Sequence, residues 1–435
     1  MLILNYPSQA TEKKIDRIIN RGLSFTVKDE KAVARILADI KKNGDRALIS
    51  YVNRFDAPDL KRNNLKVTRS EISAARRKVN RGFMQSLKLA VRQIEDFHKE
   101  QKEKSWITTD PSGKILGQLA RPVDAAGIYV PGGQGGKTPL VSSVLMGGIP
   151  AKIAGVEKIC LATPPTKSGD INPHLLVAAE RVGIDTIFKV GSAWGIAALA
   201  YGTETIPKVD VIVGPGNIYV TLAKKMVAGT VGIDMIAGPS EILVIADDTA
   251  EPEYIAADLL SQAEHDPLAS SILITTSDTV AQKVSEALTR QLAQLPRKEI
   301  AEASLKKFGV LIVVKDLEVA FELANKIAPE HLELQLDDPF QYVGKVRNAG
   351  ALFLGKYTPE PVGDYVAGPN HVLPTAGTAR FASALSVAHF TKKTSLIHYP
   401  ETVFRKEAGH IARLAEIEGL GAHANSVKIR VKKGN

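Results

Sequence analysis

Two adjacent residues, Glu330 and His331, are the first candidates for proton-transfer chemistry. They follow Pro329, which ends a predicted helix and presents the next side chains from a loop. Neighbouring side chains on an extended backbone point to opposite sides, so this carboxylate and imidazole could serve two separate proton transfers. A capping histidine beside a solvated glutamate fits the same residues equally well. His371, in another proline-bounded loop, is a similar candidate.

A second group of side chains has the residue types of a metal site. Gln262 and His265 are three residues apart in a predicted helix, so their side chains share one face. Asp364 follows a predicted strand, and His423 lies in a predicted loop of small residues. Histidines with oxygen donors suit zinc in a catalytic site. The spacing leaves two alternatives open: a helix-end histidine bound to backbone carbonyls, and Glu264 as ligand in place of Gln262.

The glycine-rich segment at 131–138 is a near match to a triphosphate-binding loop, which needs Gly, four residues and then Gly-Lys-Thr. Pro131 stands where the first glycine belongs, and proline lacks an N–H and fixes φ, so a triphosphate site is disfavoured. A second small-residue turn, at 214–217, also follows a predicted strand, and such turns let a dinucleotide approach the backbone. The chain has no Gly-x-Gly-x-x-Gly motif, so the residues alone leave the cofactor undecided.

Short apolar runs alternate with helical patterns over most of the chain, which predicts parallel sheets covered by helices on both faces. Charged helical patterns at 30–41, 69–78 and 81–102 precede them. Eight strands are too many for one such sheet, so we expect two, with a break near Gly238. The predicted strands lie at 126–130, 158–162, 186–190, 209–213, 242–246, 271–275, 310–314 and 351–354.

At 435 residues the chain exceeds the size of a single core, so several domains are expected. We predict a helical N-terminal arm at 1–23, a discontinuous α/β domain from 24–126 and 239–384, and a second α/β domain at 127–238. A tail at 385–435 would carry a helix at 401–417 and a short strand at 427–431. The tail has little apolar surface of its own, so it should pack on the body or on a second subunit.

Composition argues against several classes of protein. The net charge is +9, but Lys and Arg are scattered and form no aromatic-interleaved stripe, so we expect no nucleic-acid partner. Cys160 is the only cysteine, lies in an apolar run and is expected in the core, which suits the reducing cytoplasm. We expect no signal peptide and, without 18 unbroken apolar residues, no membrane span.

Taken together, the motifs resemble the histidinol dehydrogenase family. Each motif is short, but their order and approximate spacing hold from about residue 25 to 430. The matching segments lie at 127–133, 206–210, 214–217, 237–241, 260–265, 329–332, 363–365, 370–375 and 418–423.

The resemblance implies two Rossmann-like parallel-sheet domains without the glycine fingerprint, with NAD on the 127–238 side. It implies oxidation of L-histidinol through an aldehyde to L-histidine with two NAD, the last step of histidine biosynthesis. His331 resembles the family's base, and Glu330 the residue that activates water. One zinc per subunit would hold the substrate, chiefly as an orienting template. Family members are homodimers in which the tail reaches the partner's site.

The remaining site residues follow from the same resemblance. The residues that look like zinc ligands, which would also border the substrate with His331, are Gln262, His265, Asp364 and His423. Further substrate contacts would be Ser240, His371 and Glu418. The expected NAD contacts are Tyr129 and Asn217.

One position departs from the family pattern. Trp194 stands where the family usually carries a glutamine that contacts NAD, and an indole has no acceptor to replace the amide oxygen. Trp194 could stack on a cofactor ring, or the pocket could be altered. A zinc-dependent dehydrogenase of another small alcohol is therefore the first alternative, and a nucleotide hydrolase the second.

Overall fold

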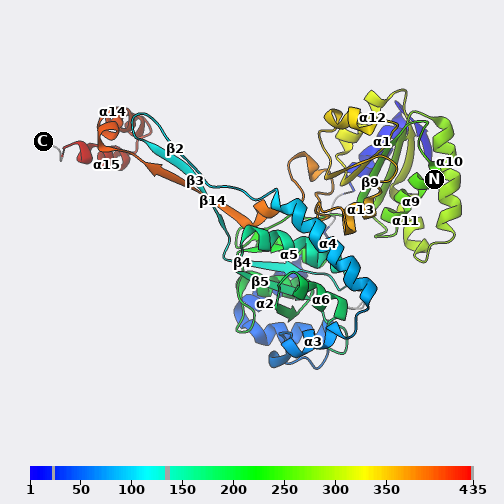
Figure 1. Cartoon of the computed structure of the whole chain (residues 1–435), viewed down its shortest axis with the longest axis horizontal. Coiled ribbons are helices and arrows are strands. Elements are labelled where there is room, and N and C mark those ends of the chain that lie inside the picture. The colour runs from blue at the N-terminus through cyan, green and yellow to red at the C-terminus, as the bar shows by residue number, and fades with distance from the viewer. Residues whose placement is uncertain (22–24, 133–137, 433–435) are drawn as a thin grey trace. The chain divides into compact units, whose positions relative to one another are not determined.

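The computed structural model describes residues 1–21, 25–132 and 138–432. Most of the predicted phosphate-loop segment, at 133–137, lies outside these residues. The chain divides into two compact units, one formed by Met1–Gln101 with Val123–Phe390 and the other by Lys102–Pro122 with Thr391–Asn435 (Figure 1). No helix in the described ranges is long and apolar enough to cross a membrane.

The first unit contains a five-stranded and a six-stranded sheet, and every strand pair in both is parallel. The five-stranded sheet has the order β6 (Thr186–Lys189), β5 (Lys158–Thr163), β4 (Ala125–Tyr129), β7 (Val211–Val213), β8 (Gly232–Ile233). The six-stranded sheet has the order β1 (Ile3–Asn5), β11 (Gly309–Val313), β10 (Ser270–Thr275), β9 (Glu241–Ala246), β12 (His331–Gln335), β13 (Ala351–Leu354). The predicted strands fall on either side of residue 238 as expected.

Alternating side chains of each strand enter two separate cores, which is why both sheets need helices on both faces. In β9, Leu243 packs with α1 and α12, whereas Val244 packs with α9, α10 and α11, and Figure 1 shows these two helix layers. The helices of this unit are α1 (Gln9–Ile19), α2 (Val27–Tyr51), α3 (Arg69–Arg76), α4 (Arg81–Lys99), α5 (Val141–Ala154), α6 (Pro173–Arg181), α7 (Ser192–Tyr201), α8 (Ile218–Val227), α9 (Pro252–Ala263), α10 (Asp278–Leu292), α11 (Lys298–Phe308), α12 (Leu317–Ile327) and α13 (Glu360–Tyr365).

The packing of the N-terminal hundred residues differs from expectation in two ways. Residues 1–23 are not only a helical arm, because β1 pairs with β11 and extends the six-stranded sheet. Helices α2, α3 and α4 were assigned with residues 239–384, but they pack on the five-stranded sheet, where Val33 shares a core with Tyr129 and Ile94 shares one with Ile128. These helices are amphipathic, and an apolar stripe on a helix does not specify which of two sheets it covers.

The second unit consists of an antiparallel three-stranded sheet, in the order β14 (Thr391–His398), β3 (Ile115–Pro122), β2 (Trp106–Thr109), and the helices α14 (Glu401–Ile417) and α15 (Gly421–Lys432). The predicted strand at 427–431 is wrong, because Val427 packs with Ala412, Ala415 and Ala424 in a small core between the two helices. Strand β14 escaped prediction because its polar sequence lacks the apolar alternation of a half-buried strand.

Candidate active site

The predicted acid–base pair lies at the amino end of β12, which stands between β9 and the edge strand β13 in the six-stranded sheet. Ala328 ends α12 in the left-handed conformation, with φ of 54°, and the chain then turns into the strand at His331. We expected a loop to present the pair, but Glu330 is only 7% exposed and His331 only 4%. Burial at a strand end fixes both side chains and strengthens every electrostatic interaction between them and their neighbours.

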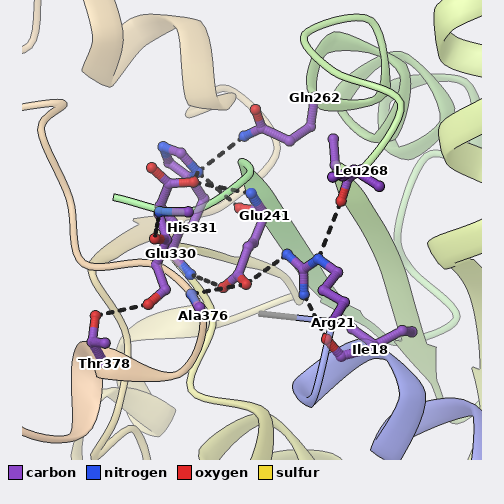
Figure 2. Close-up of polar contacts among 12 residues, drawn as sticks. Ile18, Arg21, Glu241, Gln262, Leu268, Glu330, His331, Ala376 and Thr378 are labelled. Atoms are coloured by element: carbon purple, nitrogen blue, oxygen red, sulfur yellow. Dashed lines mark hydrogen bonds and ion pairs between the residues drawn. The ribbon is translucent and has the colours of Figure 1, made fainter. Parts of the chain in front are cut away.

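Glu241, the first residue of β9, contacts this pair through three different groups (Figure 2). Its backbone N–H donates to Glu330 Oε2 at 2.9 Å, and its carboxylate Oε2 accepts from the Glu330 backbone N–H at 3.1 Å. Its carbonyl oxygen lies 2.9 Å from His331 Nδ1. The two glutamates therefore clamp each other, and the imidazole is held by the same residue.

The carbonyl contact favours a proton on Nδ1 of His331, and the Gln262 amide, which lies 3.0 Å from the same atom, fits this tautomer only when its oxygen faces the ring. A carbonyl only accepts, so Nδ1 donates and Nε2 keeps its lone pair. Nε2 is buried and has no hydrogen-bond partner among the described residues. Burial lowers the pKa of His331, which favours the neutral ring with a free Nε2. Such an imidazole is suited to take a proton from a substrate.

Two buried carboxyl groups, those of Glu330 and Glu241, lie beside the single guanidinium of Arg21. Burial, followed by the neighbouring Glu241 carboxylate, raises the pKa of Glu330 well above its usual range. Arg21, in the turn that follows α1, pairs with Glu241 at 2.6 Å, and both side chains are at most 5% exposed. The pKa of Glu241 is raised by burial, and the charge of Arg21 opposes that rise.

A group of possible metal ligands lies beside the pair. His331, Glu360 and Asp364 each offer an atom within 4.8 Å of the others. Burial, and then the charge of Glu360, raises the pKa of Asp364 to about 8, as expected where buried carboxylates lie close together. Gln262 is buried, and its Nε2 lies 3.0 Å from His331 Nδ1. Asp364 and Gln262, both predicted ligands, thus border one imidazole.

The other predicted metal and substrate residues are placed as follows. His265 lies just beyond the end of α9, exposed, and its charge contributes, after burial, to lowering the pKa of both His331 and His371. His371 has a pKa lowered to about 4 by burial, and its buried Nε2 lacks a partner in the described part of the chain.

Ser240, half-buried, directly precedes β9. Glu418 and His423 lie in the second unit, both exposed. His423 lies within α15 and not in the predicted loop.

A cavity of about 670 Å³ lies at the carboxyl ends of β4 and β7. The strand order turns back between these two neighbours, and such switch points are where open α/β sheets bind ligands. Both predicted NAD contacts, Tyr129 and Asn217, line this cavity, with Pro131 and Gly132 from the first glycine-rich turn. The Tyr129 hydroxyl accepts from Ser192 N at 3.0 Å, and Asn217 caps α8.

Trp194 forms part of the wall of the same cavity. Its indole N–H donates to Asp56 Oδ2 at 2.8 Å, and its ring stacks on Phe55 with 5.3 Å between centroids. Burial raises the pKa of Asp56 to about 6, although the hydrogen bond from Trp194 opposes the rise. The indole N–H is therefore bound to a carboxylate of the same chain. Because Trp194 only donates, it does not supply the acceptor oxygen that an amide at this position would present.

Four residues of the two sites were missed from the sequence, namely Arg21, Asp56, Glu241 and Glu360. Two buried residues beside Glu360 were missed as well, namely Asp258 and Glu333, which are hydrogen-bonded to each other, with Glu333 also accepting from the Glu360 N–H. A signal existed for two of them. Glu241 begins an otherwise apolar run and Glu333 stands between two leucines, and a charged side chain is rarely buried without a partner. The others come from segments distant in sequence, so only the fold brings them to the site.

Comparison with known proteins decides the family. The family model described as Histidinol dehydrogenase matches residues 20–431. This chain belongs to the histidinol dehydrogenase family. It is 57% identical to the histidinol dehydrogenase of Desulfotalea psychrophila over 421 residues, which cover 96% of each chain. It is 54% identical to that of Carboxydothermus hydrogenoformans, covering 92% of this chain and 94% of the relative.

A solved structure agrees with the sequence relatives. The crystal structure of histidinol dehydrogenase from Elizabethkingia anophelis superposes with a TM-score of 0.92 at 41% identity, covering 100% of this chain and 98% of the other. The family relation and the mixed α/β fold with parallel sheets expected from the motifs are therefore confirmed.

Proposed function

We propose that this protein oxidises L-histidinol through the aldehyde to L-histidine and reduces two NAD⁺. The observation that carries the proposal is the buried Glu330–His331 pair, in which Glu241 leaves His331 Nε2 free. It lies beside the predicted ligands Gln262 and Asp364. Membership of the histidinol dehydrogenase family supports the choice of substrate.

In the first oxidation, His331 Nε2 accepts the hydroxyl proton of the substrate. The carbinol carbon gives up hydride to NAD⁺, so the C–O bond becomes a carbonyl and one NADH and one proton are formed. The neutral state of the ring, favoured by burial, makes the lone pair available near neutral pH.

In the second oxidation, Glu330 accepts a proton from water as the water oxygen adds to the aldehyde carbon. The resulting hydrate loses its remaining C–H hydrogen as hydride to a second NAD⁺ and one hydroxyl proton, and so becomes the carboxylic acid, which ionises. The overall change consumes one water and two NAD⁺ and releases two NADH and three protons. The raised pKa of Glu330 brings this carboxyl closer to the range of an effective general base.

The zinc ligands that we propose are Gln262, His265, Asp364 and His423. The buried imidazole and carboxylates around Asp364 suit a divalent ion with nitrogen and oxygen ligands, and Glu360 is a further donor there. When bound, zinc would orient the amino and imidazole nitrogens of the substrate. Ser240, His371 and Glu418 are the remaining proposed substrate contacts.

NAD is proposed to bind in the cavity of Tyr129 and Asn217. Its place at a strand-order switch point and its volume of about 670 Å³ support this assignment. We further propose a homodimer in the cytoplasm, in which the second unit, residues 102–122 and 391–435, supplies Glu418 and His423 to the partner's site. The exposed apolar side chains Leu414 and Ile417 on α14 are suited to burial in such a dimer.

The test is a spectrophotometric assay with L-histidinol and NAD⁺ that counts NADH per histidinol consumed. We expect a ratio of two, with activity lost on chelation and restored by Zn²⁺. No reduction by zinc-loaded protein would refute the proposal. Reduction with another small alcohol and little with histidinol would favour the first alternative, and ATP turnover without NADH formation the second.

A further inference from the structure

We propose that Arg21 and Glu241 are positioning residues for the Glu330–His331 pair, and that the Glu241 carboxylate, neutralised by Arg21, sets where Glu330 lies. The inference rests on the proposed function, because it assigns these two residues to the second of the two oxidation steps. Neither residue was among the site residues expected from the sequence, and both act through Glu330 and not on the substrate.

The Glu241 carboxylate ties three segments of the chain together. Oε2 accepts from the Glu330 backbone N–H at 3.1 Å, and Oε1 accepts from Ala376 N at 3.0 Å and from Arg21 Nη2 at 2.6 Å. Ala376 has a φ of 53°, a left-handed conformation that costs free energy in a residue with a Cβ. The hydrogen bond to Glu241 helps to hold that turn, which follows Thr375 in the loop that carries His371.

Arg21 is a fixed counter-charge and not a loose surface cation. Its side chain is 3% exposed. Nε donates to the Leu268 carbonyl at 3.1 Å and Nη1 to the Ile18 carbonyl at 2.8 Å, so the guanidinium is anchored before it meets Glu241 (Figure 2). Among the described residues no other cation pairs with Glu241. Without Arg21, a buried carboxylate would stand unpaired opposite the Glu330 carboxyl, and the two would repel each other.

The two oxidation steps depend differently on this pair. His331 is oriented by the backbone carbonyl of Glu241, a contact that a side-chain substitution leaves in place. The Glu330 segment, in contrast, is held by the Glu241 carboxylate as well as by its N–H. Loss of the counter-charge should therefore displace Glu330 more than His331, and the second oxidation should be the more sensitive.

The experiment uses Arg21→Met, which removes the charge and keeps most of the volume. With histidinal as substrate, we expect kcat to fall at least about tenfold, since a small displacement of a general base forfeits part of its 10²- to 10⁴-fold contribution. The first NADH formed from histidinol should slow less than the second, and KM for histidinol should change less than about twofold. Arg21→Lys should recover part of the lost rate, because it restores the charge without the planar fork.

Arg17→Met is the matched control. Arg17 lies in the last turn of α1, four residues before Arg21, and its guanidinium is over the same Phe308 ring. Its side chain is exposed, and no contact joins it to Glu241 in the described structure. It should leave both steps unchanged. The double variant Arg21→Met/Glu241→Gln removes both buried charges, but its amide has one oxygen where the carboxylate accepts from both Glu330 N and Ala376 N. It should therefore fold with a somewhat lower Tm than the parent and keep the slow second step.

Three results would overturn the proposal. One is a folded Arg21→Met variant with both steps within twofold of the parent. Another is an equal loss in both steps that follows Tm and that lysine does not relieve, which would make the role purely structural. If Arg21→Met does not fold, the double variant decides, and a normal second step in it refutes the positioning role. The parent's ratio of two NADH per histidinol tests the proposed function separately.

Discussion

The Asp56→Asn substitution should stabilise the protein in alkaline buffer and have little effect in acid. Burial raises the pKa of Asp56 from 3.8 to about 6 in the folded protein. For an acid with a raised pKa, the favourable contribution is full below the unfolded value of 3.8 and is lost as pH rises through 6. The shift of about 2 pH units corresponds to roughly 3 kcal/mol of lost stability at pH 8 and about 1 kcal/mol at pH 4.5.

Asparagine resembles the protonated acid, so its stabilising effect should follow this difference. At pH 8 the gain in the free energy of unfolding should approach about 3 kcal/mol. From this must be subtracted about 1 kcal/mol, because the hydrogen bonds from Trp194 and Gly191 weaken when the charge of residue 56 is removed. Urea unfolding and Tm at pH 8 and 4.5 measure it, with the exposed Asp59→Asn as control for removal of one charge. The same change at both pH values, or a loss of stability at pH 8, would refute the reasoning.

Three further predictions concern the active site and the tail. Glu330→Gln should still form the first NADH from histidinol but slow the second about 10²-fold or more, measured by single-turnover absorbance, and normal completion would remove its assigned role. Mixing His423→Ala with His331→Ala protein should restore part of the activity through mixed dimers, and verified subunit exchange without recovery would contradict a shared site. Glu333 is fully buried and hydrogen-bonded to Asp258, so Glu333→Gln should keep Tm within a few degrees. Glu333→Ala should lower the free energy of unfolding in urea by about 2–4 kcal/mol, because it also loses the bond to the Glu360 N–H. Equal effects of the two substitutions would contradict this account.

The parallel-sheet organisation could be predicted because short β-branched apolar runs that alternate with helical patterns at regular spacing are typical of buried parallel strands. All eight predicted strands are present, and the two sheets separate near Gly238. Strand β12 was not among the predicted strands, since Glu333 and Gln335 interrupt its apolar pattern. The sequence pattern predicts which face of a helix is buried, but not which of two similar sheets covers that face. Helices α2 to α4 accordingly pack on the sheet that was not expected.

For the candidate site, the residues proposed to react were easier to find in the sequence than the residues that hold them. Glu330 and His331 stand out because a reactive pair follows a proline, and the family motifs include them. Arg21 has no such signal. It is 220 residues from Glu241 in sequence, and nothing in the surrounding residues distinguishes it from the exposed Arg17. Burial of a charge becomes visible only when the fold supplies its partner.

The two candidate sites lie at opposite ends of their sheets, and only one of them follows the usual rule that open α/β folds bind ligands at carboxyl strand ends. The cavity proposed for NAD lies at carboxyl strand ends, where glycine-rich turns leave room for a large ligand. The acid–base pair lies at the amino ends of β9 and β12, where the backbone N–H and carbonyl of Glu241 are not used up by the sheet and bind Glu330 and His331 instead. A strand end thus supplies both a donor and an acceptor at a fixed spacing. The Arg21 ion pair is what allows a carboxylate to stand there in a buried position.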